Sequence, residues 1–206
     1  MDRKIAIIDF EAGNIFSVIN AFKKVKCEII IAKKPTDLIG VDKIVLPGVG
    51  SFNAIKGNLD SLGFTEYLKK HTEKGGFLLG ICIGMQLLFE FGEEGGRTSG
   101  LGLVKGCVVP FNSIDGYRVP HMGWNDVCDQ GGYGLLESMK IKQGTSFYFV
   151  HSFHAVLDED IPHFTCNYCN ENVLSGFKKG NILGYQFHPE KSQRAGIELI
   201  RDFINL

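Results

Sequence analysis

The segment Gly80-Ile81-Cys82-Ile83-Gly84 has the residue types of a nucleophile elbow. An apolar run, Phe77 to Ile81, precedes Cys82 and a helical pattern, Met85 to Phe91, follows it, so we expect the thiol at a sharp strand-to-helix turn. The flanking glycines allow a strained backbone and close approach of a substrate. A helix N-terminus favours the thiolate, the nucleophilic form. Taken alone, Cys82 suits core packing about as well, because free cysteines are among the most buried residues.

A matching base is found near the end of the chain, in Phe187-His188-Pro189-Glu190. This segment follows the apolar run Ile182 to Tyr185, so His188 and Glu190 are expected at the end of a strand. The imidazole would take the thiol proton and return it to a leaving amine, and the carboxylate would fix the tautomer. Residues i and i+2 of an extended segment project to the same side, which would orient the pair. In isolation, a strand-end histidine beside a solvated carboxylate is the more ordinary interpretation.

A third segment, Pro47 to Phe52, reads Pro-Gly-Val-Gly-Ser-Phe and follows the short apolar run Lys43 to Leu46. A glycine-containing turn of this kind exposes backbone N–H groups. Acyl transfer needs such donors to stabilise an oxyanion. The alternative is an ordinary turn between a strand and a helix.

Taken together, these segments resemble the class I glutamine amidotransferases, and within them the glutaminase subunits of imidazole glycerol phosphate synthase. The segments Pro120-His121-Met122-Gly123-Trp124-Asn125 and Lys191-Ser192 are typical of the narrower family, and the others are shared with related glutaminases. The resemblance extends over the whole chain, through Ile7-Ile8-Asp9, Gly13-Asn14, Ser17-Val18, Leu46 to Phe52, Gly80 to Glu90, Pro120 to Asn125, Tyr148 to Ser152 and Phe187 to Ser192.

The resemblance implies that the chain hydrolyses glutamine to glutamate through a catalytic triad of Cys82, His188 and Glu190. It further implies that the released ammonia passes to a synthase (cyclase) subunit with a (β/α)8 barrel, in a heterodimer of the histidine pathway. The matching positions for binding glutamine are Gly50, Ser51, Gln86, Glu94, His151, Ser152 and Phe153. Those for the partner interface are Asn14, His121, Trp124, Tyr148 and Lys191. Without the resemblance, Gln86 is an ordinary polar helix residue, Glu94 is a surface charge in a loop, and Trp124 fits the core equally well.

The first loop departs from the family pattern. It usually reads Asp-Tyr-Gly-x-Gly-Asn, whereas here Glu11 replaces the first glycine of Asp9-Phe10-Glu11-Ala12-Gly13-Asn14. This loop is associated with the synthase interface. The substitution leaves open a paralogous branch, which supplies ammonia to sugar amidination in surface-polysaccharide synthesis.

The composition indicates a single compact domain, 1–206. The 206 residues are 44% hydrophobic, and no Pro- or Ser-rich break divides them. The 22 basic and 23 acidic side chains almost cancel, which argues against a nucleic-acid footprint or an anionic membrane surface. No segment reaches the roughly 20 apolar residues of a membrane span, so a cytoplasmic protein is expected.

Neither a phosphate-binding loop nor a dinucleotide fingerprint is present in the sequence, so no cofactor is expected. The acceptor of ammonia should therefore lie on another chain. The six cysteines are typical of a reduced intracellular protein. Cys166 and Cys169, with His151 and His154, imitate a zinc set. If Cys166 and Cys169 lie in a strand, their spacing puts them on opposite faces, unsuited to joint chelation, and no metal is expected.

The element pattern predicts an α/β fold with a doubly wound, mostly parallel sheet and a site at the carboxyl ends of its strands. The likeness to the amidotransferases makes that sheet flavodoxin-like. Strands are expected at Lys4 to Asp9, Cys27 to Ala32, Lys43 to Leu46 and Phe77 to Ile81, and helices at Ile15 to Val25 and Glu66 to Lys74. The C-terminal half should add antiparallel strands, including Phe147 to His151, Phe164 to Tyr168, Val173 to Phe177 and Ile182 to Phe187. Ser192 should cap a final helix whose apolar face is Gly196, Leu199, Ile200 and Phe203.

Overall fold

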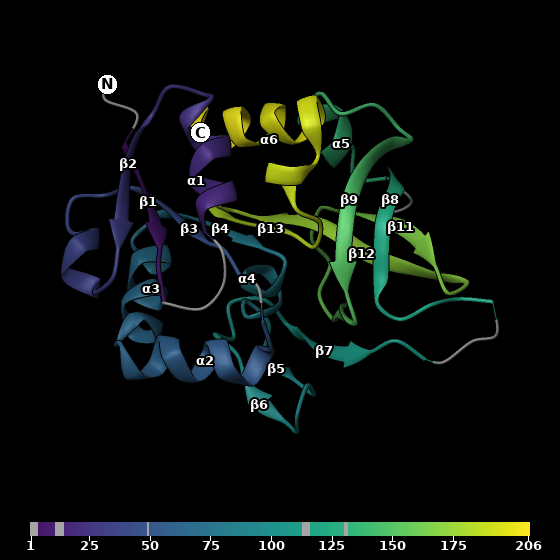
Figure 1. Ribbon diagram of the computed structural model, residues 1–206, viewed down its shortest axis with the longest axis horizontal. Helices are drawn as coiled ribbons and strands as arrows, with labels where there is room; N and C mark the ends of the chain where they lie inside the picture. Colours follow the sequence, from purple (N-terminus) through teal and green to yellow (C-terminus); the bar gives the residue numbers. More distant parts are fainter. Residues whose placement is uncertain (1–3, 11–14, 49, 113–115, 130–131) are drawn as a thin grey trace.

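A computed structural model describes residues 4–10, 15–48, 50–112, 116–129 and 132–206. Its main feature is a nine-stranded sheet in the order β2-β1-β3-β4-β13-β12-β11-β8-β9 (Figure 1). In chain order these strands are β1 (Lys4–Ile8), β2 (Glu28–Ala32), β3 (Lys43–Leu46), β4 (Phe77–Ile81), β8 (His121–Cys128), β9 (Thr145–His151), β11 (His163–Tyr168), β12 (Glu171–Lys179) and β13 (Ile182–Tyr185).

The first five strands of that order, β2-β1-β3-β4-β13, pair in parallel. This is the flavodoxin-like arrangement, so the predicted doubly wound sheet is confirmed. Two helices, α1 (Phe16–Lys23) and α6 (Gln193–Asn205), lie on one face, and α2 (Phe52–Ser61) and α3 (Phe64–Glu73) lie on the other (Figure 1). Helices on both faces explain why β1 and β4 are apolar and buried along nearly their whole length.

The second half of the sheet is antiparallel, as the sequence predicted: β12 pairs with β13 and β11, and β8 pairs with β11 and β9. The strand expected at Ile182 to Phe187 differs in one respect, because β13 pairs in parallel with β4 and completes the parallel set. A separate four-stranded sheet, β10-β7-β5-β6, was not predicted. It consists of β5 (Phe91–Gly92), β6 (Thr98–Ser99), β7 (Gly106–Pro110) and β10 (Phe153–Leu157).

The helix after Cys82 is much shorter than the predicted Met85 to Phe91. Helix α4 spans only Ile83–Gln86. The next three residues, Leu87, Leu88 and Phe89, are all fully buried, so they cannot form an amphipathic helix with an exposed face. Their carbonyls accept hydrogen bonds from the backbone of the segment 101–104 instead of from a continuing helix.

The remaining short elements are η1 (Pro35–Leu38), α5 (Leu135–Ser138) and η2 (Pro189–Lys191). The expected apolar face of α6 is confirmed, because Gly196, Leu199, Ile200 and Phe203 are buried. Among the described residues, none of the helices has the length and hydropathy needed to cross a membrane.

The topology brings three chain segments to one edge of the sheet. Strands β3, β4 and β13 are neighbours and run in the same direction, so Pro47, Cys82 and the segment after Tyr185 all leave the sheet at the same end. Phe187, inside the last of these segments, is fully buried and stacks on Phe147, with ring centroids 4.1 Å apart. Core packing therefore anchors the residues on both sides of Phe187.

We predict that Phe187→Ala lowers the free energy of unfolding by about 3–5 kcal/mol, since it leaves a cavity where a fully buried ring was packed. Urea denaturation followed by circular dichroism measures the loss. Ile39→Ala is the control: Ile39 is 72% exposed, and its truncation should change stability by less than about 0.5 kcal/mol. Equal losses of unfolding free energy for the two substitutions would contradict the anchoring role of the Phe187 ring.

Candidate active site

Cys82 occupies the sharp turn expected between β4 and α4, with φ 53° and ψ −113°. A positive φ is costly for a residue with a side chain, and it persists only where the surroundings hold it. Here the surroundings are tight. A Cβ on Gly84 would come within 1.8 Å of the Leu46 carbonyl oxygen, and one on Gly80 within 2.6 Å of the Gly84 carbonyl oxygen. The two glycines flanking Cys82 are thus required by close backbone packing, and the thiol is 3% exposed.

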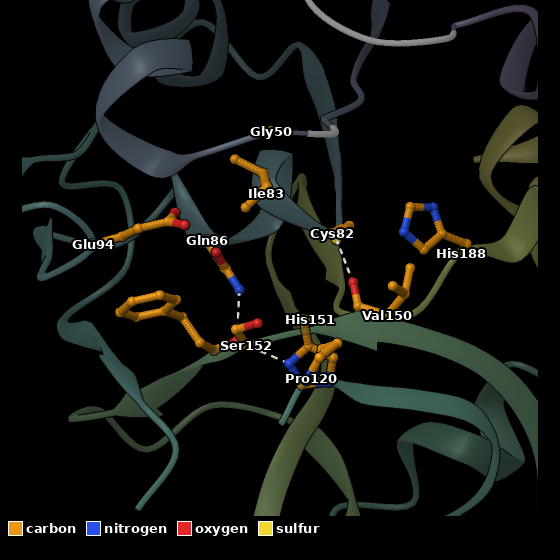
Figure 2. Close-up of a pocket in the computed structure, with 11 residues that line it drawn as sticks. Gly50, Cys82, Ile83, Gln86, Glu94, Pro120, Val150, His151, Ser152 and His188 are labelled. Atoms are coloured by element: carbon orange, nitrogen blue, oxygen red, sulfur yellow. Dashed lines mark hydrogen bonds between the residues drawn. The ribbon is translucent and has the colours of Figure 1, made fainter. Parts of the chain in front are cut away.

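His188 and Glu190 form a buried pair next to this turn. The His188 Nδ1 lies 2.7 Å from Glu190 Oε1, and their side chains are 2% and 4% exposed. An extended backbone was expected to orient this pair, but Pro189–Lys191 forms a 3-10 turn, and the two side chains meet across that turn. Figure 2 shows the His188 ring turned towards Cys82 across the pocket.

The charge state of His188 is set by these two neighbours. Burial by itself would lower the pKa of the imidazole, but hydrogen bonding and charge interactions with Cys82 and Glu190 outweigh it and raise the pKa to about 10. The Nε2 atom is buried and has no hydrogen-bond partner among the described residues, and the ring is turned towards Cys82 (Figure 2). The site therefore favours an imidazolium next to the sulfur.

These residues open onto a pocket of about 270 Å³. The sequence-predicted residues that line it are Gly50, Cys82, Gln86, Glu94, His151, Ser152, Phe153 and His188 (Figure 2). Ser51, also expected there, instead donates to Asn53 Oδ1 at 2.8 Å. The Glu94 carboxylate accepts the Phe52 N–H at 2.6 Å, which ties the loop after β5 to the start of α2. Three further lining residues, Ile83, Pro120 and Val150, were not singled out from the sequence.

Gln86 and Gln186 form an amide pair beneath the pocket. Gln86 Nε2 donates to Phe153 O at 2.9 Å and to Gln186 Oε1 at 3.0 Å. Gln86 Oε1 is buried and has no partner among the described residues. Gln186 was missed at the sequence level, where its only signal was its position two residues before His188.

His121 and His151 are hydrogen bonded to each other at 2.9 Å, between Nδ1 and Nε2. Burial lowers the pKa of His121 to about 4 and, together with the neighbouring histidine, that of His151 to about 3, so both rings are neutral near pH 7. The expected interface position of His121 is not met, because its side chain is only 3% exposed and stacks on Tyr168. A direct partner contact needs an exposed side chain.

Three other expected interface residues lie on neighbouring elements, Trp124 on β8, Tyr148 on β9 and Lys191 in η2. Trp124 is 49% exposed, which excludes the alternative of core packing, and neighbouring Met122 is 62% exposed. The Tyr148 ring contacts Trp124, with centroids 6.0 Å apart, and the Lys191 ammonium lies 5.7 Å from the Tyr148 ring. Asn14 and Glu11 lie outside the described residues.

The cysteine-rich hairpin differs in part from the expected strand. Cys166 lies in β11, but Cys169 lies in the following turn with φ 53°, and both are buried. Across the described ranges, no group of three or more His, Cys, Asp or Glu side chains is placed to hold a metal ion. All six cysteines are free thiols.

A family model described as "Glutamine amidotransferase class-I" matches residues 6–206. The chain is 43% identical to imidazole glycerol phosphate synthase subunit HisH 1 of Campylobacter jejuni, over 98% of this chain and 100% of that protein. It is 40% identical to subunit HisH of Halalkalibacterium halodurans, over 97% and 94%. A chloroplastic synthase hisHF of Arabidopsis thaliana is 36% identical, over 99% of this chain but 34% of its own length.

Solved structures share the fold at lower identity. A crystal structure of a glutamine amidotransferase superposes with a TM-score of 0.75 at 19% identity, covering 98% of this chain and 97% of that one. A chain of PurLQS from Thermotoga maritima gives 0.72 at 18% identity, covering 100% and 99%. These likenesses support the architecture described above.

We predict that Glu190→Gln lowers the pKa of His188, because the amide removes the carboxylate charge beside Nδ1. Titration of the His188 ring proton by NMR measures it, and Glu171→Gln, which removes the carboxylate near His154, should leave His188 unchanged. The same substitution should change how stability depends on pH. The pKa of His188 is higher in the folded state than in the unfolded chain, where it is near 6.5, so its protonation stabilises the fold fully below pH 6.5. That contribution is lost as the pH rises towards 10, so the free energy of unfolding should fall more for wild type than for Glu190→Gln between these pH values. Parallel plots of unfolding free energy against pH would refute the pairing.

Proposed function

The chain belongs to the class I glutamine amidotransferases, and we propose that it is the glutaminase subunit of an imidazole glycerol phosphate synthase. In this role it hydrolyses glutamine to glutamate and passes ammonia to a cyclase subunit in histidine biosynthesis. The observation that carries the proposal is that Cys82 and His188 line one pocket, with Glu190 hydrogen bonded to His188 behind it.

The first half-reaction begins with a thiolate at Cys82 and an imidazolium at His188. Sulfur attacks the side-chain amide carbon of glutamine, and a C–S bond forms as the carbonyl π electrons move to oxygen. His188 then gives its proton to the amide nitrogen, the C–N bond breaks, and ammonia leaves. Glu190 keeps the ring oriented through Nδ1 and stabilises its positive charge.

The second half-reaction removes the glutamyl group from sulfur. His188, now neutral, takes a proton from water as the water oxygen attacks the thioester carbon. The C–S bond then breaks to release the thiolate, and the new carboxyl group loses its proton to solvent to give glutamate. Both tetrahedral intermediates carry a negative oxygen. Backbone N–H groups of the turn around Gly50 are suited to stabilise that oxygen, because Gly50 lines the pocket beside Cys82.

The rest of the pocket would hold the glutamine molecule itself. Gln86 offers a buried carbonyl oxygen that has no partner within the described part of the chain, which suits a donor on the substrate. Glu94 adds a carboxylate that can face the substrate α-ammonium group, and the backbone of Ser152 and Phe153 completes the wall. We assign no cofactor, because amide hydrolysis by a thiolate and an imidazole needs none.

The proposed partner is a cyclase subunit with a (β/α)8 barrel, bound as a heterodimer. Its docking surface on this chain would include Met122, Trp124, Tyr148 and Lys191, since exposed aromatic residues are favoured anchors of interfaces. By the family resemblance, we also propose that Asn14 contributes to the partner interface and Ser51 to glutamine binding. The similarity to synthase subunits favours the histidine pathway over sugar amidination. We place the complex in the cytoplasm, where its biosynthetic substrates are found.

We predict that Cys82→Ala abolishes glutamate release, because no other nucleophile of the proposed triad can form the thioester. The assay measures glutamate produced from glutamine in the presence of the cyclase subunit, captured from the native cell. Cys107→Ala is the matched control, since that half-buried thiol lies in β7, and it should retain activity. Binding of the cyclase should survive Cys82→Ala. Glutamate release at the wild-type rate would remove Cys82 from its role.

We predict that Trp124→Ala weakens the affinity for the cyclase by about 2 kcal/mol, the size typical of a truncated aromatic anchor. Isothermal titration calorimetry measures it. Because the ring is half exposed, thermal unfolding should change little. Ile31→Ala, another exposed apolar residue on distant β2, should bind like wild type. An unchanged affinity for Trp124→Ala would place the interface elsewhere.

A further inference from the structure

Gln186 lies next to the reacting sulfur of Cys82 but is not a member of the proposed triad. Its side chain is 0% exposed, and its Nε2 lies 3.9 Å from Cys82 Sγ with donor geometry. Its Oε1 accepts from Gln86 Nε2 at 3.0 Å. One amide thus connects the nucleophile to a residue that lines the pocket.

The two histidines beside this amide pair have defined tautomers. Phe153 O can only accept, so His151 Nδ1, 2.8 Å away, carries the proton. In a neutral ring the other nitrogen then accepts, so His121 Nδ1 must donate to His151 Nε2. His121 Nε2 in turn accepts from Asn125 Nδ2 at 3.2 Å. Every donor in this chain has an acceptor, and the rings are neutral because burial lowers both pKa values.

The same carbonyl fixes Gln86. Phe153 O accepts from His151 and also from Gln86 Nε2, and the second N–H of Gln86 goes to Gln186 Oε1. A flipped Gln86 amide would place its oxygen against Phe153 O, which can only accept, so that orientation is excluded. Because Gln186 presents its oxygen to Gln86, its nitrogen faces Cys82.

We propose that Gln186 is a further catalytic residue, whose side-chain N–H donates to the Cys82 sulfur and stabilises the thiolate, while its oxygen orients Gln86 towards glutamine. His121 and His151 are positioning residues in this network, because they act only through Phe153 O and Gln86. The titratable groups that line the pocket with Cys82 are His188, paired with Glu190, neutral His151 and Glu94. Gln186 adds an uncharged donor to this set. The inference deepens the proposed glutaminase function and rests on it for the meaning of the thiolate.

The test is the rate at which iodoacetamide alkylates Cys82 in the full chain as a function of pH, followed by peptide mass spectrometry. Iodoacetamide reacts with the thiolate, so the midpoint of the profile reports the thiolate population without any need for glutamine turnover. Gln186→Met removes the donor at similar volume and should move the midpoint upward by about one pH unit. Gln186→Glu keeps the shape but places a negative charge beside the sulfur, and should move it further.

Asn181→Leu is the matched control. Asn181 is the amide at the other end of β13, donating to Thr72 O at 2.9 Å, so its loss perturbs the same strand without touching sulfur. Its alkylation profile should match wild type. Coincident profiles for wild type and Gln186→Glu, with circular dichroism showing a folded chain, would overturn the inference even if Gln186→Met fails to fold. If the shifts occur but wild type with the cyclase releases no glutamate, the proposed function fails and the contact between Gln186 and the sulfur stands.

Discussion

The rest of the site depends on one constraint, the close approach of the Cys82 turn to the end of β3. The Gly84 backbone packs so tightly against Leu46 O that even a methyl group does not fit. This contact forces the chain to turn immediately after β4, which holds Cys82 at a positive φ and raises its sulfur above the carboxyl edge of the sheet. The neighbouring β13 ends at the same edge, so sheet order brings the segment that bears the imidazole to the side of the sheet where the sulfur lies.

Around this turn the structure separates charged from neutral groups. His188 has its pKa raised by Cys82 and Glu190, whereas His121 and His151, equally buried but without a carboxylate beside them, have theirs lowered. The difference is physical: burial penalises every imidazolium, and only a nearby negative charge reverses the penalty. One histidine can therefore move protons in the proposed reaction, and the other two keep fixed tautomers that orient amides.

The sequence predicted the parts of the fold that local pattern determines. Continuous apolar runs gave the parallel strands, and Gly80 and Gly84 indicated the turn at Cys82. Sequence-based prediction was wrong where contacts between distant parts of the chain determine the structure. The helix after Cys82 stops at Gln86 because the segment 101–104 takes the next carbonyls, and His121 is buried because Tyr168, distant in sequence, stacks on it. Gln186 was missed for the same reason, since its partners Cys82 and Gln86 lie on another strand and helix.

The edge strand β9 connects the proposed docking surface to the imidazole. Among the described strands, none pairs with its outer edge. Instead, His188 N–H donates to Tyr148 O at 2.9 Å. Ser192 Oγ accepts from Tyr148 N at 3.0 Å and donates to His188 O at 2.7 Å. Ser192 is the N-cap residue of α6, as expected, but its hydroxyl forms these hydrogen bonds to Tyr148 and His188 and does not cap the helix. The backbone that bears Tyr148 on the surface is therefore the backbone that holds His188 in the pocket. The proposed docking surface on Trp124 and Tyr148 and the catalytic imidazole are therefore separated by a single backbone hydrogen bond, from His188 N–H to Tyr148 O.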